Sequence, residues 1–313
     1  MAPSHTAAKP DPLRKSWRDL TWDVAAGLLL ACSVTMLTDF SRRMLGSDPD
    51  SLGIVSVSVQ AVFTVAATST FTKAGWQWIE SLLSKFKIGM HSQSRWRLAL
   101  SAALFAVICP IWIWLPARLA VYYNDRGVSL EDTNPAVALE DLERSTALNP
   151  RWSAAQYNLG ELLEKSYQYD AAASHYQQSI GTNNRDIKSY NNLARVLLLN
   201  GNAITALSIT DQALTIGTTD KQALAALYKN RGSAEFDLGF NTQAIADARS
   251  SENSEVNAAA YCLLGQIYTK TGKTADARAA WDEFSRLKGS SDPVQKMAAP
   301  DCTLRAEEAH ATN

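Results

Sequence analysis

Three asparagines stand at matching positions in the second half of the sequence. Asn158, Asn192 and Asn230 follow one another at intervals of 34 and 38 residues, and each precedes a glycine or an alanine by two positions. An amide side chain both donates and accepts hydrogen bonds, so a column of amides could bridge a peptide backbone without reading its sequence. The competing interpretation is that these amides are only solvated. We take them as candidate peptide contacts.

Basic and amide side chains occur on the turns next to two of these asparagines. They are Lys188, Asn191, Arg195 and Lys229. On neighbouring helices they would form a local basic patch that attracts acidic groups. Glu161 and Glu164, close to Asn158 in the sequence, carry the opposite charge. An ordinary charged surface is therefore the competing interpretation.

Motifs for catalysis or metal binding are missing from the sequence. It contains no phosphate-binding glycine loop, nucleophile elbow, metal-binding helix or carboxylate pair with a nearby base. The four histidines are dispersed, and the four cysteines, Cys32, Cys109, Cys262 and Cys302, form no CxxC pair. This spacing argues against a disulfide framework and against a sequence-local zinc site. We therefore expect no cofactor, no metal and no enzymatic activity.

Two columns of small residues define the elements that would position these side chains. The first column is Gly127, Gly160, Ala194, Gly232 and Gly265, and the second is Ala138, Ala172, Ala206, Ala244 and Ala277. Both columns step by 33 or 34 residues and share one longer step of 38. Small residues on two helices let their backbones approach, while larger apolar residues one turn away fill the groove between pairs. Two columns with one period indicate a repeat array rather than a single globular core.

The pattern resembles the tetratricopeptide repeat, a helix-turn-helix unit of about 34 residues. In the second unit, Leu159 and Gly160 supply the Leu-Gly pair of the first helix, and Ala172 and Tyr176 supply the small and aromatic residues of the second. The glycines that fall between the two helices of later units are Gly201, Gly239 and Gly272. A tight reversal favours glycine there, because glycine has no side-chain penalty.

The resemblance covers residues 119–288 and implies an all-α solenoid of about five helix-turn-helix repeats. In the resembled family, the first helix of each pair lines a concave face that binds extended or helical peptides, often through an asparagine at the position of the column described above. Members that bind acidic carboxyl termini use basic residues on this face. Glu161 and Glu164 depart from that pattern here.

The amino-terminal part of the chain is interpreted as a membrane region. A helix needs about 20 mostly apolar residues to cross a bilayer, and tryptophans beside lysines suit the headgroup zone. In order, the predicted parts are a basic tail at 1–21, a membrane region at 22–118, the solenoid at 119–288 and a flexible tail at 289–313. Within the membrane region, the predicted spans lie near 22–38, 52–71 and 98–117, and an interfacial segment lies at 73–90.

Two of the predicted spans have competing interpretations. Residues 29–32 of the first, Leu-Leu-Ala-Cys, faintly resemble a lipoprotein processing site, so a cleaved signal peptide competes with a span. Apolar residues that continue to Leu37 argue against cleavage. The second span carries Gln60 among serines and threonines. Small hydroxyl side chains suit close helix packing, and the alternative is a polar path across the membrane.

The distribution of positive charge predicts an orientation. With the amino terminus in the cytoplasm, the inner loops hold nine Lys and Arg near the membrane and the outer loops hold four. Cytoplasmic loops carry the excess of positive charge, and three spans then place the solenoid on the extracytoplasmic face. The opposite orientation stays open for two reasons. With one span fewer, the solenoid would lie on the cytoplasmic face. Cys262 and Cys302 have no obvious partner in the sequence, which favours a reducing compartment.

The sequence therefore predicts a multi-pass integral membrane protein that acts as a non-catalytic scaffold or adaptor. Its expected partners are the lipid bilayer and a protein or peptide held in the concave groove, and its oligomeric state is left open. Residues 123–288 hold 16 Lys and Arg against 20 Asp and Glu, which gives no electrostatic reason to expect nucleic acid. The alternative function is a membrane channel, or a transport or secretion accessory subunit, regulated by its repeats.

Overall fold

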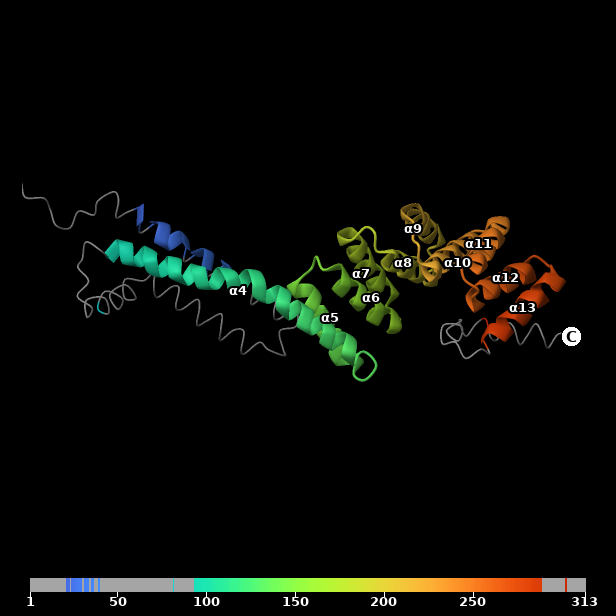
Figure 1. The fold of residues 1–313 in the computed structure, drawn as a ribbon, viewed down its shortest axis with the longest axis horizontal. Helices are drawn as coiled ribbons and strands as arrows, with labels where there is room; N and C mark the ends of the chain where they lie inside the picture. The colour runs from blue at the N-terminus through green and yellow to red at the C-terminus, as the bar shows by residue number, and fades with distance from the viewer. Residues whose placement is uncertain are drawn as a thin grey trace, which may run out of the picture. The chain divides into compact units, whose positions relative to one another are not determined.

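The computed structural model describes residues 21–22, 24–29, 31–33, 35–36, 39, 81, 93–288 and 302, and every regular element in these ranges is a helix (Figure 1). The chain divides into two compact units, Met1–Asp125 with Glu143–Asn149 and Arg126–Leu142 with Pro150–Asn313. The helices are α4 (Gln93–Leu130), α5 (Pro135–Leu148), α6 (Ser153–Lys165), α7 (Tyr169–Thr182), α8 (Ile187–Leu199), α9 (Ala203–Ile216), α10 (Lys221–Asp237), α11 (Asn241–Ser254), α12 (Ala258–Lys270) and α13 (Thr274–Lys288).

Helix α4 is long and apolar. Its portion Ser101–Leu130 is the one helix in the described part of the chain that is long and apolar enough to cross a membrane. Large apolar side chains on it lie open, including Val107 at 60% and Trp114 at 68% exposure. The helix also contains Pro110 and Pro116, each of which lacks the N–H for an intrahelical hydrogen bond.

The structure describes some of the predicted membrane segments and not others. The predicted span at 98–117 lies within α4. The predicted span at 22–38 overlaps a short apolar helix, Val24–Ser33, which has half the length that a bilayer core requires. The segments at 52–71 and 73–90 lie outside the described residues, apart from Ser81. A multi-pass arrangement therefore stays a prediction.

Polar side chains start several of the repeat helices. Asn202 accepts a hydrogen bond from the backbone N–H of Thr205 at the start of α9, and Asn257 accepts one from Ala260 at the start of α12. Asp220 accepts two, from Gln222 and its neighbour, at the start of α10. Each cap satisfies a backbone donor that the first helical turn leaves unpaired. The sequence thus fixes where these helices begin.

The turns between paired helices share one backbone conformation. Gly201, Gly239 and Gly272 have φ angles of 73°, 87° and 73°, as the turn prediction requires. The equivalent position in the second repeat is Tyr167, which has a φ angle of 59°. Only glycine enters this left-handed region without a steric penalty. The tyrosine therefore closes its turn at an energetic cost.

The small-residue columns lie where two helices cross. A methyl group added to Gly160 would come within 2.7 Å of the Tyr176 ring, and one added to Gly265 would come within 2.5 Å of the Trp281 ring. Ala172 of the second column is fully buried. The columns are therefore small because an aromatic ring or a backbone occupies the space that a larger side chain would need.

In the second unit the helices stack as successive pairs. Helices α6 and α7, α8 and α9, α10 and α11, and α12 and α13 pack together, and the first helices also contact one another, α6 with α8, α8 with α10 and α10 with α12. One hydrophobic cluster includes Leu142, Leu159 and Leu193, and another includes Ile267 and Trp281. No pair buries its apolar face alone, so stability accrues by stacking. The first helices form one continuous face.

Candidate functional site

A pocket of about 510 Å³ opens on the face formed by α8, α10 and α12. We call it the groove pocket. Its polar lining includes Asn191 and Arg195 from α8, Lys229 and Asn230 from α10, and Gln266 from α12, and its apolar lining includes Ala225, Ala226 and Leu263. First helices of three successive repeats therefore supply its walls, as the repeat pattern predicts for a binding groove.

The structure brings together four of the seven residues predicted from the sequence. Asn191, Arg195, Lys229 and Asn230 all line the groove pocket. The other three, which lie outside it, are Asn158, Asn192 and Lys188. Asn158 is half-buried, Asn192 is buried and Lys188 is exposed.

Two of the predicted asparagines tie neighbouring repeats together. Asn230 is 2% exposed, and its Nδ2 donates to Oδ1 of Asn191 at 2.8 Å and to the Asn191 carbonyl oxygen at 3.1 Å. Asn192 donates from Nδ2 to the hydroxyls of Tyr157 and Tyr176 at 3.2 and 3.3 Å. These bonds satisfy amides that would otherwise be buried without partners. A peptide that used them would have to replace these bonds, so the basic side chains beside them are the more accessible contacts.

Lys229 is the cation that the groove pocket leaves without a counter-charge. Its Nζ donates to Oδ1 of Asn230 at 3.1 Å, and no carboxylate among the described residues pairs with it. Burial, followed by the charge of Arg195, lowers the pKa of Lys229 to about 8, because both disfavour the charged form. Below that pH the pocket therefore contains a positive charge that an acidic group could neutralise.

Arg195 differs from Lys229 because Glu164 already neutralises it. Its Nε and a terminal nitrogen contact the two carboxylate oxygens of Glu164 at 2.8 and 2.9 Å. The same carboxylate accepts a hydrogen bond from the Tyr176 hydroxyl at 2.9 Å. This two-point contact is the geometry in which arginine binds carboxylates best. Within the groove pocket, Lys229 is thus the one cation without a carboxylate partner among the described residues, because Glu164, which the sequence placed against the predicted basic patch, neutralises Arg195.

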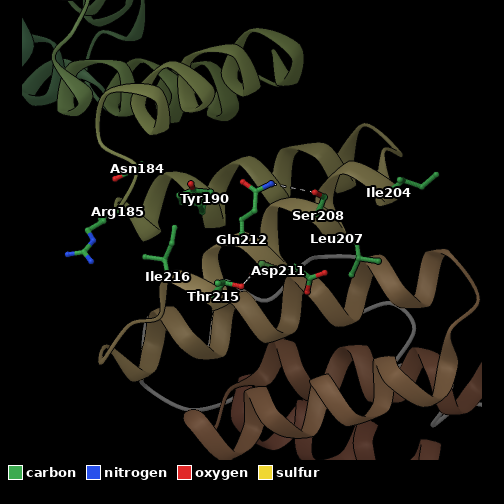
Figure 2. A pocket seen from close by; sticks show the side chains of 10 residues that line it. All are labelled: Asn184, Arg185, Tyr190, Ile204, Leu207, Ser208, Asp211, Gln212, Thr215 and Ile216. Carbon is green, nitrogen blue, oxygen red and sulfur yellow. Dashed lines mark hydrogen bonds between the residues drawn. The ribbon is translucent and has the colours of Figure 1, made fainter.

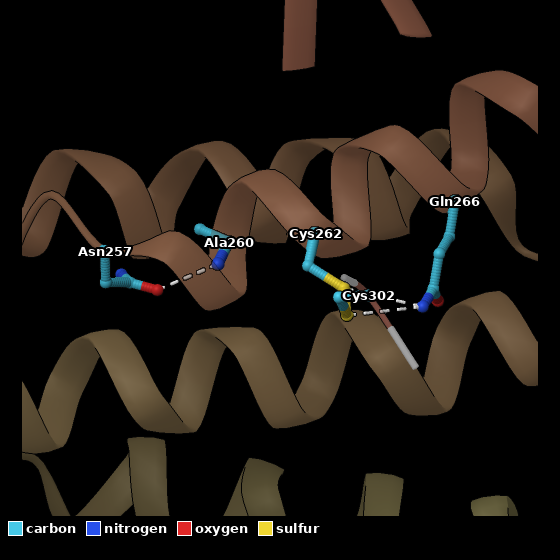
Figure 3. The surroundings of a disulfide bond; sticks show 5 residues. All are labelled: Asn257, Ala260, Cys262, Gln266 and Cys302. Atoms are coloured by element: carbon cyan, nitrogen blue, oxygen red, sulfur yellow. Dashed lines mark hydrogen bonds between the residues drawn. A yellow bond between two sulfur atoms is a disulfide. The ribbon is translucent and has the colours of Figure 1, made fainter. Parts of the chain in front are cut away.

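Cys262 and Cys302 form a disulfide, which the sequence interpretation did not expect (Figure 3). Their Cα atoms are 5.7 Å apart although 40 residues separate them in the chain. The prediction that these two cysteines are unpaired is therefore wrong. It failed because Cys302 lies beyond the repeats, so no local spacing connects it to α12. Cys32 and Cys109 are free.

A second pocket of about 810 Å³ lies along α9 and the start of α8 (Figure 2). We call it the outer pocket. Ile204 on its rim is 73% exposed. Its acidic side chain, Asp211, already pairs with Arg231 at 3.1 Å. None of the seven predicted residues lines this pocket, so the groove pocket is the candidate site.

The chemistry available in the groove pocket is that of binding. It combines Lys229, the ion-paired Arg195, the carboxylate of Glu255, amide side chains that donate and accept, and apolar walls. Among the described residues, no three His, Cys, Asp or Glu side chains are placed to hold a metal ion.

No protein-family model matches the chain, and no curated protein matches it. Among solved structures, PilW, described as a widely conserved type IV pilus biogenesis factor, is 16% identical with a TM-score of 0.51 over 62% of this chain and 86% of PilW. TTC0263, a thermophilic TPR protein of Thermus thermophilus, is 21% identical with a TM-score of 0.45, and the alignment covers 63% of this chain and 97% of TTC0263. YrrB, a TPR protein with an unusual peptide-binding site, is 17% identical with a TM-score of 0.45, covering 60% of this chain and 92% of YrrB.

The fold is that of a tetratricopeptide repeat solenoid. The likeness to PilW concerns the fold alone at this identity, and the repeat spacing, the glycine turns and the helix pairing of this chain agree with it. The groove pocket lies on the face that the first helices of the repeats form.

Proposed function

We propose that this protein is a membrane-anchored, non-catalytic scaffold whose solenoid binds an acidic segment of a protein partner in the groove pocket. The observation that carries the proposal is Lys229, a cation without a carboxylate partner among the described residues, in a pocket walled by three successive repeats. An acidic side chain or a terminal carboxylate would neutralise it in a partly desolvated site, where a charge-assisted hydrogen bond is strongest.

Helix α4 supports the anchoring part of the proposal. Its portion Ser101–Leu130 has the length and the composition of a membrane span, and large apolar side chains along it are exposed. Lipid would cover these side chains without any further protein. The helix ends at Leu130 and α5 begins at Pro135, so only a short turn separates the proposed span from the next helix along the chain.

The disulfide supports an extracytoplasmic solenoid. Disulfides persist in oxidising compartments and are rare in the cytosol. The Cys262–Cys302 pair therefore agrees with the orientation that the distribution of Lys and Arg favours. It also removes the reason, drawn from unpaired cysteines, to prefer the opposite orientation.

Selection from a random peptide library displayed on phage tests the proposed binding. The bait is the full chain in detergent micelles, in its disulfide form and in its dithiol form. We expect enriched peptides to carry Asp, Glu or a free terminal carboxylate, and Lys229→Met to abolish the enrichment because it removes the charge and keeps the length of the side chain. Lys188→Met is the matched control, since Lys188 is exposed on α8 and lies outside the groove pocket.

Two results would remove the proposal. One is that neither form enriches any peptide. The other is that the enriched peptides bind Lys229→Met as well as they bind the wild-type chain. The alternative of a channel or transport accessory subunit depends on residues 52–71, which lie outside the described residues, so no observation favours it over the scaffold.

A further inference from the structure

Cys302 lies inside the groove pocket. It is 4% exposed and lines the same pocket as Arg195, Lys229 and Asn230. It comes 14 residues after α13 ends at Lys288, whereas the pocket is walled by α8, α10 and α12. A residue from beyond the solenoid thus occupies part of the proposed binding site.

The contacts of the disulfide place both sulfur atoms against the same groove side chain. Gln266 Nε2 lies 3.5 Å from Cys262 Sγ and 3.7 Å from Cys302 Sγ (Figure 3). Cys262 and Gln266 are four residues apart on α12, so one helical turn presents both to the groove. Residue 302 is therefore bonded covalently to the groove wall.

We propose that the Cys262–Cys302 disulfide is a redox-sensitive closure of the groove, in which this chain's own residue 302 takes up space that a partner needs. The proposal rests on the proposed function for its biological consequence. In the disulfide form, residue 302 cannot leave the pocket. In the dithiol form, it is held only by non-covalent contacts, and a partner can displace it.

The opening step is thiol–disulfide exchange with a dithiol reductant. A thiolate of the reductant attacks one of the two protein sulfur atoms, and the S–S bond breaks to release the other as a thiolate. The second thiol of the reductant then attacks the mixed disulfide and releases the remaining protein sulfur atom. The protein gains two electrons and two protons as Cys262 and Cys302 become thiols, and the reductant becomes a disulfide. Gln266 is placed to donate a hydrogen bond to the departing thiolate.

Chemical labelling of Lys229 tests the closure without any partner. The full chain in detergent micelles is treated with trinitrobenzenesulfonate at pH 8, and peptide mass spectrometry gives the labelling rate of each lysine. Reduction with dithiothreitol, which is removed before labelling because the reagent also reacts with thiols, is expected to raise the rate at Lys229 several-fold and to leave the rate at exposed Lys188 unchanged. Cys302→Ser is expected to label like the reduced wild-type chain, with or without dithiothreitol.

If the Cys302→Ser variant does not fold, the comparison of the wild-type chain before and after reduction still tests the closure. Labelling of Lys229 that stays constant or falls on reduction would overturn the closure. So would a dithiothreitol effect that persists in Cys302→Ser. This readout requires no bound peptide, so its failure is distinguishable from failure of the peptide selection, which tests the proposed function in both redox forms.

Discussion

At the scale of single residues, the groove face depends on buried polar side chains whose partners lie in the next repeat. Asn230 bonds to Asn191 across 39 residues of sequence, and Asn192 bonds to Tyr157 across 35. Each bond joins α10 to α8 or α8 to α6. These two amides therefore hold neighbouring repeats together, whereas the Lys229 ammonium contacts only Oδ1 of the adjacent Asn230 among the described residues.

A carboxylate inside the solenoid makes its stability depend on pH. Burial, followed by the charge of Asp247, raises the pKa of Glu235 to about 7, and Oε2 of Glu235 is buried without a hydrogen-bond partner among the described residues. The folded pKa exceeds the unfolded value, so the folded state binds the proton more tightly. This contribution to stability is present at low pH and is lost as pH rises towards 7. Arg231 opposes the shift and Asp211 adds to it.

We expect Glu235→Gln to stabilise the protein at pH 8 and to change it little at pH 4. The expected gain at pH 8 is on the order of 1 kcal/mol, because solvent screens this partly exposed group. Urea unfolding followed by circular dichroism at both pH values measures it. A gain of the same size at both pH values would contradict the assignment to a titrating carboxylate.

The sequence predicts which helices carry these side chains better than it predicts their hydrogen bonds and ion pairs. Asn191, Arg195, Lys229 and Asn230 meet in one pocket because the repeat period places them on first helices. Glu164, the ion-pair partner of Arg195, lies one repeat earlier. The repeat spacing does not determine which side-chain rotamers of neighbouring repeats come into contact. The bonds therefore became known only from the structure.

At the scale of helices and turns, steric fit determines the repeat. Trp281 is nearly fully buried against Gly265, and its ring is held by a hydrogen bond from Nε1 to the Thr269 hydroxyl at 3.2 Å. Because the ring cannot rotate away without losing this bond, position 265 accepts only a hydrogen atom as its side chain. The small residues of the repeat are therefore required by the packing between helices, and they do not serve to make the backbone flexible.

Gly265→Ala is expected to destabilise the solenoid by about 1–3 kcal/mol, the usual cost of overpacking a core. Gly181→Ala is the matched control, since Gly181 lies in α7 with nothing within 4 Å of an added methyl group. That change should be neutral or should stabilise by about 0.5–1 kcal/mol, because alanine favours helix. Urea midpoints of the two variants check the difference, and equal midpoints would refute the packing account.

Tyr167→Gly is expected to stabilise the protein by about 0.5–1 kcal/mol. The tyrosine is 80% exposed and has a φ angle of 59°, so glycine relieves backbone strain and loses little packing. Gly201→Ala, at the equivalent turn with a φ angle of 73°, should destabilise by a similar amount. Thermal unfolding of both variants gives the test. A loss of stability in Tyr167→Gly would show that the ring contact with Tyr169 outweighs the strain.

The sequence predicts the elements well because their signals are local. The turn glycines, which the sequence analysis identifies, affect only the few residues around them. The capping residues Asn202 and Asp220 act equally locally, although the sequence analysis does not identify them. Tyr167 carries no such signal, because a tyrosine in a left-handed turn is held there by the helices on both sides. The second predicted span lies outside the described residues, so its prediction is untested.

At the scale of the whole molecule, the proposal combines an apolar helix with a groove that one residue from beyond the repeats can close. The disulfide was not predictable, because its two cysteines are 40 residues apart and Cys302 lies outside the periodic part. It now changes how the groove is understood, since a site that was expected to be open contains a covalently held residue. Reduction and partner binding are therefore expected to be coupled.

Peptide binding is expected to depend on pH through Lys229. Its pKa is lowered to about 8, so the ammonium is charged at pH 7 and largely neutral at pH 9. The affinity of an acidic peptide should therefore fall over this interval. Titrations of the reduced full chain by fluorescence anisotropy measure the effect. An affinity that is constant between pH 7 and pH 9 would contradict the role of this charge.

The affinity of one selected acidic peptide for three forms of the reduced chain tests the central claim most directly. We predict that the wild-type chain and Lys188→Met bind it equally, and that Lys229→Met raises Kd about tenfold, which corresponds to about 1.4 kcal/mol. Equal Kd values for the wild-type chain and Lys229→Met, or equal losses in both variants, would contradict the claim that the groove pocket recognises an acidic group.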